Sequence, residues 1–303
     1  MERRSFLKGS LAGAGLAAGI KTLGGMPAMA EEGGESVKKA PKAQLKLCSQ
    51  DGRIPGKTLK EKVEKLQGWG GVGLEVGGRG LAGRAKEIAD ALKGTKVKLS
   101  AICAGYSGCI ISSNKAEREK AVSSMKQILT VAGGLGSTGL VVVPAFNRQK
   151  QLVGKEARTV LVDLLGPLGE HAQKAGTRVL LEPLNRREAY FLRQLADAAS
   201  ICRDVNSPGV AMMGDFYHMY FEETSDEGAF LSAGKYCHHV HLGSIKRKLP
   251  GQDARSFVDG FRGLKRIGFR DYVSLECGCI GRPEVEIPKS FRFLEKQWAE
   301  ATV

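Results

Sequence analysis

Short apolar runs alternate with amphipathic stretches along most of the chain, from residue 44 to residue 300. Eight of the apolar runs have the length of strands, and they occupy residues 44–49, 72–78, 97–103, 139–146, 178–185, 210–216, 237–243 and 272–278. Between the runs, apolar residues recur at helical intervals, as in the series Val122, Met125, Ile128, Leu129 and Ala132. The pattern therefore predicts eight strands separated by helices.

The predicted strands are apolar on both faces, which is typical of a parallel sheet that is covered by helices. Eight such repeats within about 260 residues match a single-domain (β/α)8 barrel, the TIM barrel, better than an open sheet. A doubly wound open sheet is the alternative. In a barrel, side chains that act on a ligand gather at the carboxyl ends of the strands.

Residues 1–30 have the order of features found in an export signal. Arg3 and Arg4 precede an apolar run at 11–20, and Ala28-Met29-Ala30 has the form of a cleavage site. The segment resembles a twin-arginine signal peptide, and its apolar run is too short for a membrane span, which needs about 20 residues. Polar residues 31–42 predict a flexible leader, so the barrel is expected over residues 43–303. We expect a periplasmic or otherwise extracytoplasmic protein without a stable membrane span, whose precursor is a partner of the twin-arginine export machinery.

Charge and cysteine content limit the classes of function. The formal net charge is +14, but Lys and Arg are spread along the predicted helices and aromatic residues make up only 6% of the chain. This distribution argues against a nucleic-acid partner. The seven cysteines are odd in number and lie mostly in predicted strands, so they do not indicate a disulfide framework. Cys277 and Cys279 have no second close pair to complete a thiolate site, and we interpret them as packing residues.

The last four predicted strands each end with a polar residue that can bind a metal. These residues are Glu182, Asp215, His241 and Glu276. Each residue also has another interpretation when it is considered alone. Glu182 could cap a helix, and Glu276 could form a salt bridge to an arginine. Either His239 or His241 could be a buried histidine whose hydrogen bonds are satisfied within the core. Neighbouring strands lie about 4.8 Å apart, so the four side chains can converge. Three buried carboxylates would repel one another without a cation, and together the four residues predict a metal site.

Three carboxylates and one imidazole without a thiolate suit an octahedral ion better than a tetrahedral zinc. We expect one divalent ion, with Mn2+ favoured and Mg2+ or Co2+ as alternatives. Open coordination positions can take adjacent oxygens of a polyhydroxy-carbonyl substrate, and the ion stabilises the enolate that forms when a proton leaves the neighbouring carbon. One carboxylate can remove that proton, and a second on the other face can return it with inverted configuration.

Four motifs of the chain resemble a known family. The segments "LEPLNRRE", "GDFYHMYFEE", "HVHLGSIKRKLPG" and "VSLEC" are similar to those of the sugar isomerase/epimerase family of xylose-isomerase-like barrels, nearest to its D-tagatose 3-epimerase and hydroxypyruvate isomerase branch. The spacings between the four candidate ligands, 33, 26 and 35 residues, are those of the ketose 3-epimerases. The resemblance implies a sugar isomerase or epimerase that works through an enediolate-type intermediate.

The resemblance also implies a role for individual residues. The metal ligands would be Glu182, Asp215, His241 and Glu276, and the acid/base pair would be Glu182 and Glu276. Substrate oxygens would be bound by Glu188, His218 and Arg247.

Other functions remain open at this point. A lyase or dehydratase of the inosose-dehydratase kind would use the same site, and a non-catalytic sugar-binding protein would not need two bases. A trinuclear zinc site of the endonuclease IV kind is disfavoured, because none of the five histidines lies in the first four predicted strands. The sequence leaves open which carbohydrate or keto-acid is the substrate and whether the protein is a homo-oligomer. It also leaves open whether Glu75 contacts the site or forms a salt bridge to Arg79 or Arg84.

Overall fold

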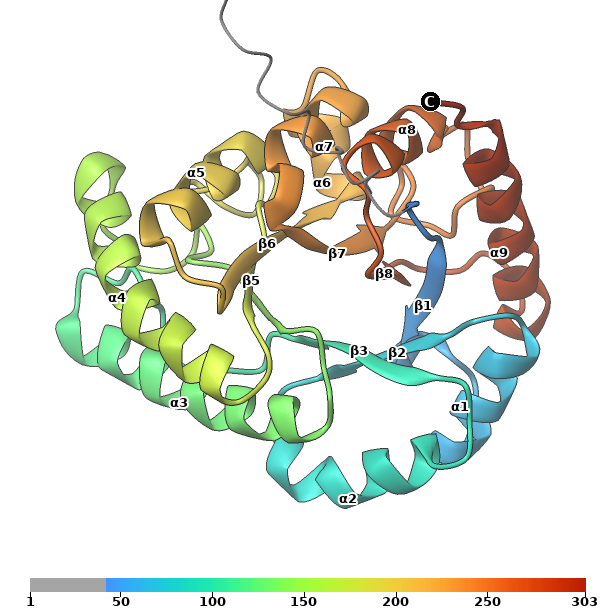
Figure 1. Ribbon diagram of the computed structural model, residues 1–303, viewed down its shortest axis with the longest axis horizontal. Helices are drawn as coiled ribbons and strands as arrows, with labels where there is room; N and C mark the ends of the chain where they lie inside the picture. Colours follow the sequence, from blue (N-terminus) through green and yellow to red (C-terminus); the bar gives the residue numbers. More distant parts are fainter. Residues whose placement is uncertain (1–41) are drawn as a thin grey trace, which may run out of the picture. The chain divides into compact units, whose positions relative to one another are not determined.

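The computed structural model describes residues 42–303, which form a closed ring of eight parallel strands inside a ring of helices (Figure 1). Each strand pairs with its neighbours in the sequence, and β8 closes the barrel on β1. The strands are β1 (Lys46–Gln50), β2 (Gly73–Gly77), β3 (Lys98–Cys103), β4 (Leu140–Val142), β5 (Val179–Leu181), β6 (Val210–Asp215), β7 (Cys237–Leu242) and β8 (Tyr272–Leu275). The expected export signal and the leader up to residue 41 lie outside the described residues.

Helices connect successive strands on the outside of the barrel, as Figure 1 shows. They are α1 (Leu59–Gly68), α2 (Leu81–Leu92), α3 (Lys115–Gly134), α4 (Gly154–Lys174), α5 (Leu195–Val205), α6 (Phe216–Glu222), α7 (Asp226–Ala233), α8 (Val258–Arg266) and α9 (Pro283–Glu300), with 3-10 turns η1 (Asp51–Arg53) and η2 (Gly234–Tyr236). Two helices, α6 and α7, stand between β6 and β7. In α3 the predicted periodic residues Met125, Ile128, Leu129 and Ala132 face the core and are buried.

All eight predicted strands are present, but β4 and β5 are shorter than expected. β4 ends at Val142 and β5 at Leu181, whereas the predicted strands continue for four further residues. Pro144 and Pro183 lie in these extensions, and a proline has no N–H to donate to a sheet ladder. The early ends of the ladders place Glu182 in an irregular segment directly above the barrel interior.

The interior of the barrel is divided between an apolar half and a polar half. An apolar cluster from β3 to β6 consists of Ala101, Val141, Leu180, Ala211 and Met213. The other strands contribute small or polar buried side chains, namely Cys48, Glu75, His239 and Ser274. A fully buried carboxylate and imidazole in this second half require polar partners, and those partners lie next to the candidate site.

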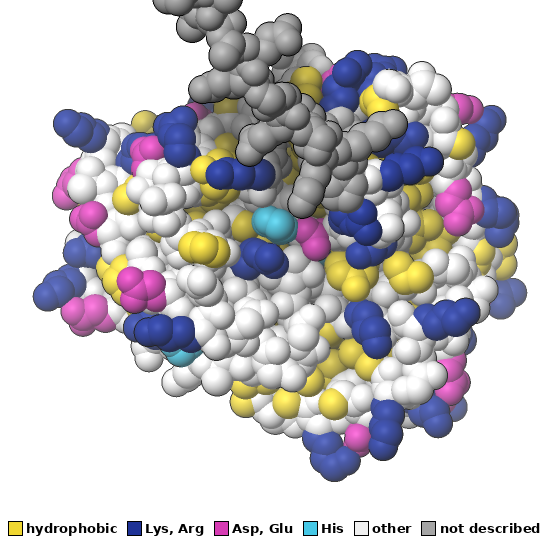
Figure 2. All heavy atoms as spheres, viewed as in Figure 1, with side chains coloured by type: hydrophobic (Ala, Val, Ile, Leu, Met, Phe, Trp, Pro, Cys, Tyr) yellow, Lys and Arg dark blue, Asp and Glu magenta, His cyan; other side chains and the backbone are white. Residues whose placement is uncertain are grey.

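Figure 2 presents one face of the molecule, part of which is covered by residues drawn in grey. Lys and Arg side chains lie both around the periphery and near the middle of this face, with Asp and Glu between them. The positive charge visible there is therefore distributed over separate elements.

All seven cysteines fall within the described residues and are free thiols. In residues 42–303, no helix is both long enough and apolar enough to cross a membrane.

Candidate metal centre

The structure brings the four candidate ligands together at the carboxyl ends of the last four strands. Glu182 directly follows β5, Asp215 is the last residue of β6, His241 lies near the end of β7, and Glu276 directly follows β8. One ligand atom from each residue lies within 4.8 Å of one from every other residue. The parallel ladder produces this convergence, since Asp215 pairs in register with His241 across β6 and β7.

Three polar atoms of this cluster have no hydrogen-bond partner within the described part of the chain. They are Oε1 of Glu182, Oδ2 of Asp215 and Nδ1 of His241, and all three are buried. His241 Nδ1 lies 3.5 Å from Oε1 of Glu182 and 3.3 Å from Oε2 of Glu276. A buried polar atom left unpaired costs about 1–3 kcal/mol. Three such atoms facing a common point are satisfied together by a bound cation, so these residues fit a divalent metal ion.

Asp215 is fixed by the helix that follows it. Its Oδ1 accepts a hydrogen bond at 2.8 Å from the backbone N–H of Tyr217 and so caps the N-terminus of α6. This bond occupies one carboxylate oxygen and leaves Oδ2 to face the centre. The short polar cluster after β6 is therefore both a helix cap and a candidate ligand, which explains why Asp215 stands at this position.

Burial and neighbouring charge act on the carboxylates in opposite directions. Burial raises the pKa of Asp215 to about 6, and it also raises the pKa of Glu182 despite the opposing effect of the nearby His241 ring. Burial disfavours ionisation of Glu276 as well, but the charges of His241 and Arg247 outweigh it and hold the pKa of Glu276 below its usual range. Burial thus disfavours the charged form of Glu182, whereas the neighbouring positive charges favour the charged form of Glu276.

Arg247 and Glu188, two of the predicted substrate contacts, lie at the edge of the cluster. Arg247 donates from Nη2 to Oε2 of Glu276 at 2.8 Å and from Nη1 to Oε1 of Glu188 at 3.3 Å. The backbone of Arg247 has a φ of 52°, which is strained for a residue with a side chain. Its carbonyl accepts a hydrogen bond from Gly278 N at 2.8 Å, so the loop after β7 is held against the end of β8.

His218, the remaining predicted substrate contact, is buried on α6 with one nitrogen directed at the centre. Its Nδ1 accepts a hydrogen bond at 3.1 Å from the backbone N–H of Asn185, and Nε2 lies 3.4 Å from Oδ2 of Asp215. Burial lowers the pKa of His218. Because Nδ1 is an acceptor, the neutral ring carries its proton on Nε2 and can donate it toward a ligand.

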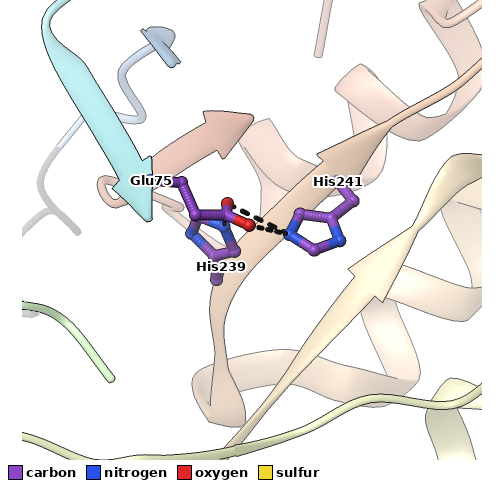
Figure 3. Close-up of side chains that lie close together, drawn as sticks. All are labelled: Glu75, His239 and His241. Carbon is purple, nitrogen blue, oxygen red and sulfur yellow. Dashed lines mark hydrogen bonds and ion pairs between the residues drawn. The ribbon is translucent and has the colours of Figure 1, made fainter. Parts of the chain in front are cut away.

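Glu75 has partners that differ from the arginines considered from the sequence. It is fully buried in β2, where Oε2 lies 2.8 Å from His239 Nε2 and Oε1 lies 3.0 Å from His241 Nε2 (Figure 3). Arg84 instead pairs with Asp51 at 2.9 Å. The alternative of a salt bridge from Glu75 to an arginine is therefore wrong, since the carboxylate lies inside the barrel and surface arginines do not reach it.

Sequence reasoning named His239 only as a possible buried histidine, and it missed Gln50. His239 and His241 are two residues apart on one strand, and this spacing places both side chains on the same face. That periodicity, combined with a glutamate inside an apolar strand, was the available signal. Gln50, at the end of β1, donates from Nε2 to Glu75 at 2.9 Å and to Glu276 at 3.0 Å. Nothing in the sequence around Gln50 predicts these two contacts.

The fold is shared with known proteins. Residues 63–297 match the xylose isomerase-like TIM barrel family. The chain is 28% identical over 254 residues to 3-dehydro-D-guloside 4-epimerase of Escherichia coli, which covers 80% of this chain and 95% of that protein. It is 32% identical over 115 residues to D-psicose 3-epimerase of Ruminiclostridium cellulolyticum, which covers 38% of this chain and 39% of that protein. The crystal structure of 3-keto-D-glucoside 4-epimerase from E. coli superposes with a TM-score of 0.76 at 27% identity, over 84% of this chain and all of that chain.

A parallel eight-stranded barrel with four ligand-type side chains at its carboxyl ends defines the class of protein. The chain belongs to the xylose isomerase-like TIM barrel family. This confirms the predicted fold and the family resemblance, and the expectation of a sugar isomerase or epimerase agrees with the relatives, which are sugar epimerases.

Proposed function

We propose that this protein is a divalent-metal-dependent epimerase that inverts the configuration of a sugar carbon next to a carbonyl group. The observation that carries the proposal is the convergence of His241 Nδ1 with Glu182 and Glu276, at 3.5 and 3.3 Å, in a buried cluster whose facing atoms lack partners among the described residues. The related epimerases support it, since their names place the inverted carbon beside a carbonyl.

The cation would be held by Glu182, Asp215, His241 and Glu276, a donor set that favours Mn2+, Mg2+ or Co2+. When bound, a divalent cation acts as a Lewis acid that polarises a carbonyl group and so acidifies the neighbouring C–H. Among these ions we propose Mn2+.

The two glutamates would move the proton. Glu182 follows β5 and Glu276 follows β8, three strands further around the barrel, so they reach a bound carbon from different sides. One carboxylate takes the proton as the C–H bond breaks, and the electron pair delocalises into the carbonyl as an enediolate-type species. The other glutamate, protonated at the start, donates its proton to the opposite face of the same carbon. The new C–H bond has inverted configuration, and no net oxidation or reduction occurs.

The surrounding side chains would bind and orient the substrate. Arg247 touches both Glu276 and Glu188, and its guanidinium stacks over Tyr217 at 4.8 Å from the ring centroid. His218 presents an Nε2–H near Asp215, where it can donate to a substrate oxygen. These donors would fix the hydroxyl groups beside the reacting carbon, and a well-oriented substrate reacts much faster than a loosely held one.

We further propose an oxidised glycoside as the substrate class. The relative that aligns with most of this chain acts, by its name, on a glycoside with a carbonyl at carbon 3 and inverts carbon 4. The ketose 3-epimerases align with smaller shares of the chain, from 34% to 73%. A sugar with a ketone in its ring would place the ketone and a neighbouring hydroxyl at the metal centre.

The proposal is tested by supplying 3-keto glycosides and, separately, D-fructose to the protein with Mn2+, and following the products by NMR. We expect the 3-keto glycoside to convert to its 4-epimer, with protein stripped by a chelator as the control. Conversion of D-fructose alone would move the substrate to the ketoses. An unsaturated product would show a lyase, and absence of turnover on every carbonyl sugar would contradict the proposed activity.

We also propose export by the twin-arginine route, on the basis of Arg3, Arg4 and the Ala28-Met29-Ala30 motif. Replacement of both arginines by lysine should leave the precursor in the cytoplasm, as cell fractionation would reveal. Unchanged export of that variant would contradict the route.

A further inference from the structure

The second polar cluster inside the barrel contains Glu75, His239 and His241 (Figure 3), and it shares His241 with the candidate metal centre. Glu75 reaches inward from β2, and the two histidines come from β7 on the opposite side of the barrel. All three side chains are fully buried. None of the roles proposed above uses Glu75 or His239. Burial of a carboxylate costs free energy unless its charge is paired and hydrogen-bonded, so the partners of Glu75 need an explanation.

The two ring nitrogens of His241 face two different clusters. Nε2 lies 3.0 and 3.1 Å from the two oxygens of Glu75. Nδ1 faces Glu182 and Glu276 and has no hydrogen-bond partner within residues 42–303. An ionised carboxylate only accepts hydrogen bonds, so Nε2 must carry a proton in this arrangement. When Nε2 carries the proton, the lone pair of the neutral ring lies on Nδ1, on the side of the metal ligands.

Glu75 is itself held in place by two further donors. His239 Nε2 lies 2.8 Å from Oε2, and the amide of Gln50 donates to Oε1 at 2.9 Å. The same Gln50 amide donates to Oε1 of Glu276 at 3.0 Å, so it connects Glu75 with Glu276, another candidate metal ligand. Both oxygens of Glu75 therefore have fixed partners, which prevents the carboxylate from turning into the metal centre.

We propose that Glu75 is a positioning residue that fixes the tautomer and the ring orientation of His241, so that only Nδ1 is presented to the cation. His239 and Gln50 hold the Glu75 carboxylate for this task. The inference rests on the proposed function, because it requires that the four-residue cluster binds a metal. A metal-bound histidine that gives its other N–H to a carboxylate is oriented and made a stronger donor, and loss of such a partner weakens metal binding about 10–100-fold.

The test compares two variants in which a carboxylate next to a histidine becomes an amide. Glu75→Gln keeps the shape of the side chain but removes the charge behind His241. Asp271→Asn is the matched control, because Asp271 Oδ2 pairs with His238 Nδ1 at 2.7 Å. His238 lies on β7 like His241, but its side chain is partly exposed and is not a member of the cluster. Full-length metal-free protein would be titrated with Mn2+ against a chromophoric chelator. We expect Glu75→Gln to bind Mn2+ about 10–100-fold more weakly than wild type, and Asp271→Asn to bind like wild type.

A second measurement separates positioning from a loss of structure. Nitrogen-15 NMR of the histidines in Mg2+-loaded wild-type protein should show the proton of His241 on Nε2, in a strongly hydrogen-bonded position. Glu75→Gln should weaken that signal, while circular dichroism and the melting temperature of the metal-free protein show that the barrel persists. If Glu75→Gln does not fold, the NMR spectrum of the wild-type protein alone still shows which ring nitrogen of His241 carries the proton. A proton on Nδ1 of His241 in the loaded protein would overturn the proposal.

The number of Mn2+ ions bound per chain and the affinity for Mn2+ together distinguish the remaining outcomes. Equal Mn2+ affinity in wild type and Glu75→Gln would overturn the positioning role while leaving the metal site intact. Two ions per wild-type chain, with one lost in Glu75→Gln, would overturn it by making Glu75 a ligand of a second ion. Wild-type protein that binds no divalent ion would overturn the proposed metal-dependent function and this inference with it.

Discussion

Arg247 donates to Oε2 of Glu276 at 2.8 Å and so joins the loop after β7 to the carboxylate that follows β8. Its other terminal nitrogen lies 3.3 Å from Oε1 of Glu188, in the segment after β5. One side chain thus connects a proposed acid/base residue with a predicted substrate contact. The positive charge also lowers the pKa of Glu276, second to the effect of His241 and against the opposing effect of burial.

Replacement of Arg247 by alanine should impair catalysis without removing the metal. The variant loses two charged hydrogen bonds, each worth about 1.5–3 kcal/mol, so we expect kcat/KM to fall about 10–100-fold or more. Metal content should stay at the wild-type value, because Arg247 is a cation and cannot be a ligand. Arg266→Ala serves as the control, since that arginine pairs with Glu227 at the helical surface. Loss of metal from Arg247→Ala would contradict the ligand assignment.

The proposed ligand set predicts one divalent ion per chain. Elemental analysis of protein purified with Mn2+ should give one ion for wild type and a strongly reduced content for Asp215→Ala, since Oδ2 of Asp215 faces the centre without a partner among the described residues. Asp204→Ala removes a carboxylate that pairs with Arg158 and should keep the full content. A wild-type content of two or three zinc ions would be inconsistent with the four-residue site.

Glu222 predicts a pH-dependent contribution to stability outside the metal centre. Burial disfavours its charge, but bonds from Arg186 N at 2.7 Å and Nε at 2.9 Å outweigh burial and lower the pKa of Glu222. A carboxylate with a folded-state pKa below its unfolded value of about 4.3 stabilises the fold above that value, and this contribution disappears as the pH falls through the folded-state pKa. At pH 7, Glu222→Gln should lower the free energy of unfolding by about 1 kcal/mol, because Arg186 is largely exposed.

Urea unfolding of wild type and Glu222→Gln at several pH values measures this contribution. Between pH 7 and pH 3, the difference between the two proteins should shrink only below about pH 4.3, the unfolded-state pKa of a glutamate. A difference that stays constant over this range would show that the charge of Glu222 contributes nothing and that only the shape of the side chain matters.

The sequence was sufficient for the architecture because each strand is apolar throughout and each helix has one apolar stripe. The alternation determined the number of strands, although the ends of β4 and β5 depended on Pro144 and Pro183, which interrupt the ladder inside the predicted strands. The convergence of Glu182, Asp215, His241 and Glu276 was also predictable, since consecutive parallel strands end at one level. These four lie together in the structure, while their roles as ligands stay a prediction.

The partners of Glu75 and Gln50 could not be derived in the same way. Glu75 comes from β2 and His241 from β7, so their contact spans the barrel interior and joins positions 166 residues apart. Local periodicity gives the face on which a side chain lies, but it does not give the partner across the barrel. Gln50 and Glu276 are separated by 226 residues and meet only because β1 closes on β8.

The proposed mechanism requires two glutamates that act on one carbon. Glu182→Gln and Glu276→Gln each keep an oxygen that can face the cation but remove the group that accepts or donates a proton. General acid/base catalysis contributes about 10²–10⁴-fold, so each variant should lose about that factor in turnover while it retains most of the metal. Turnover at the wild-type rate in both variants would disprove the paired-glutamate mechanism.

Solvent exchange at the reacting carbon tests the central claim most directly. The experiment runs the conversion of a 3-keto glycoside in deuterated water and follows the carbon next to the ketone by NMR. The returning proton comes from a glutamate that exchanges with solvent, so the product formed by wild-type protein should carry deuterium at that carbon, and both glutamine variants should incorporate it far more slowly. Epimer that forms without any deuterium, at an equal rate in wild type and in the two glutamine variants, would contradict inversion by Glu182 and Glu276.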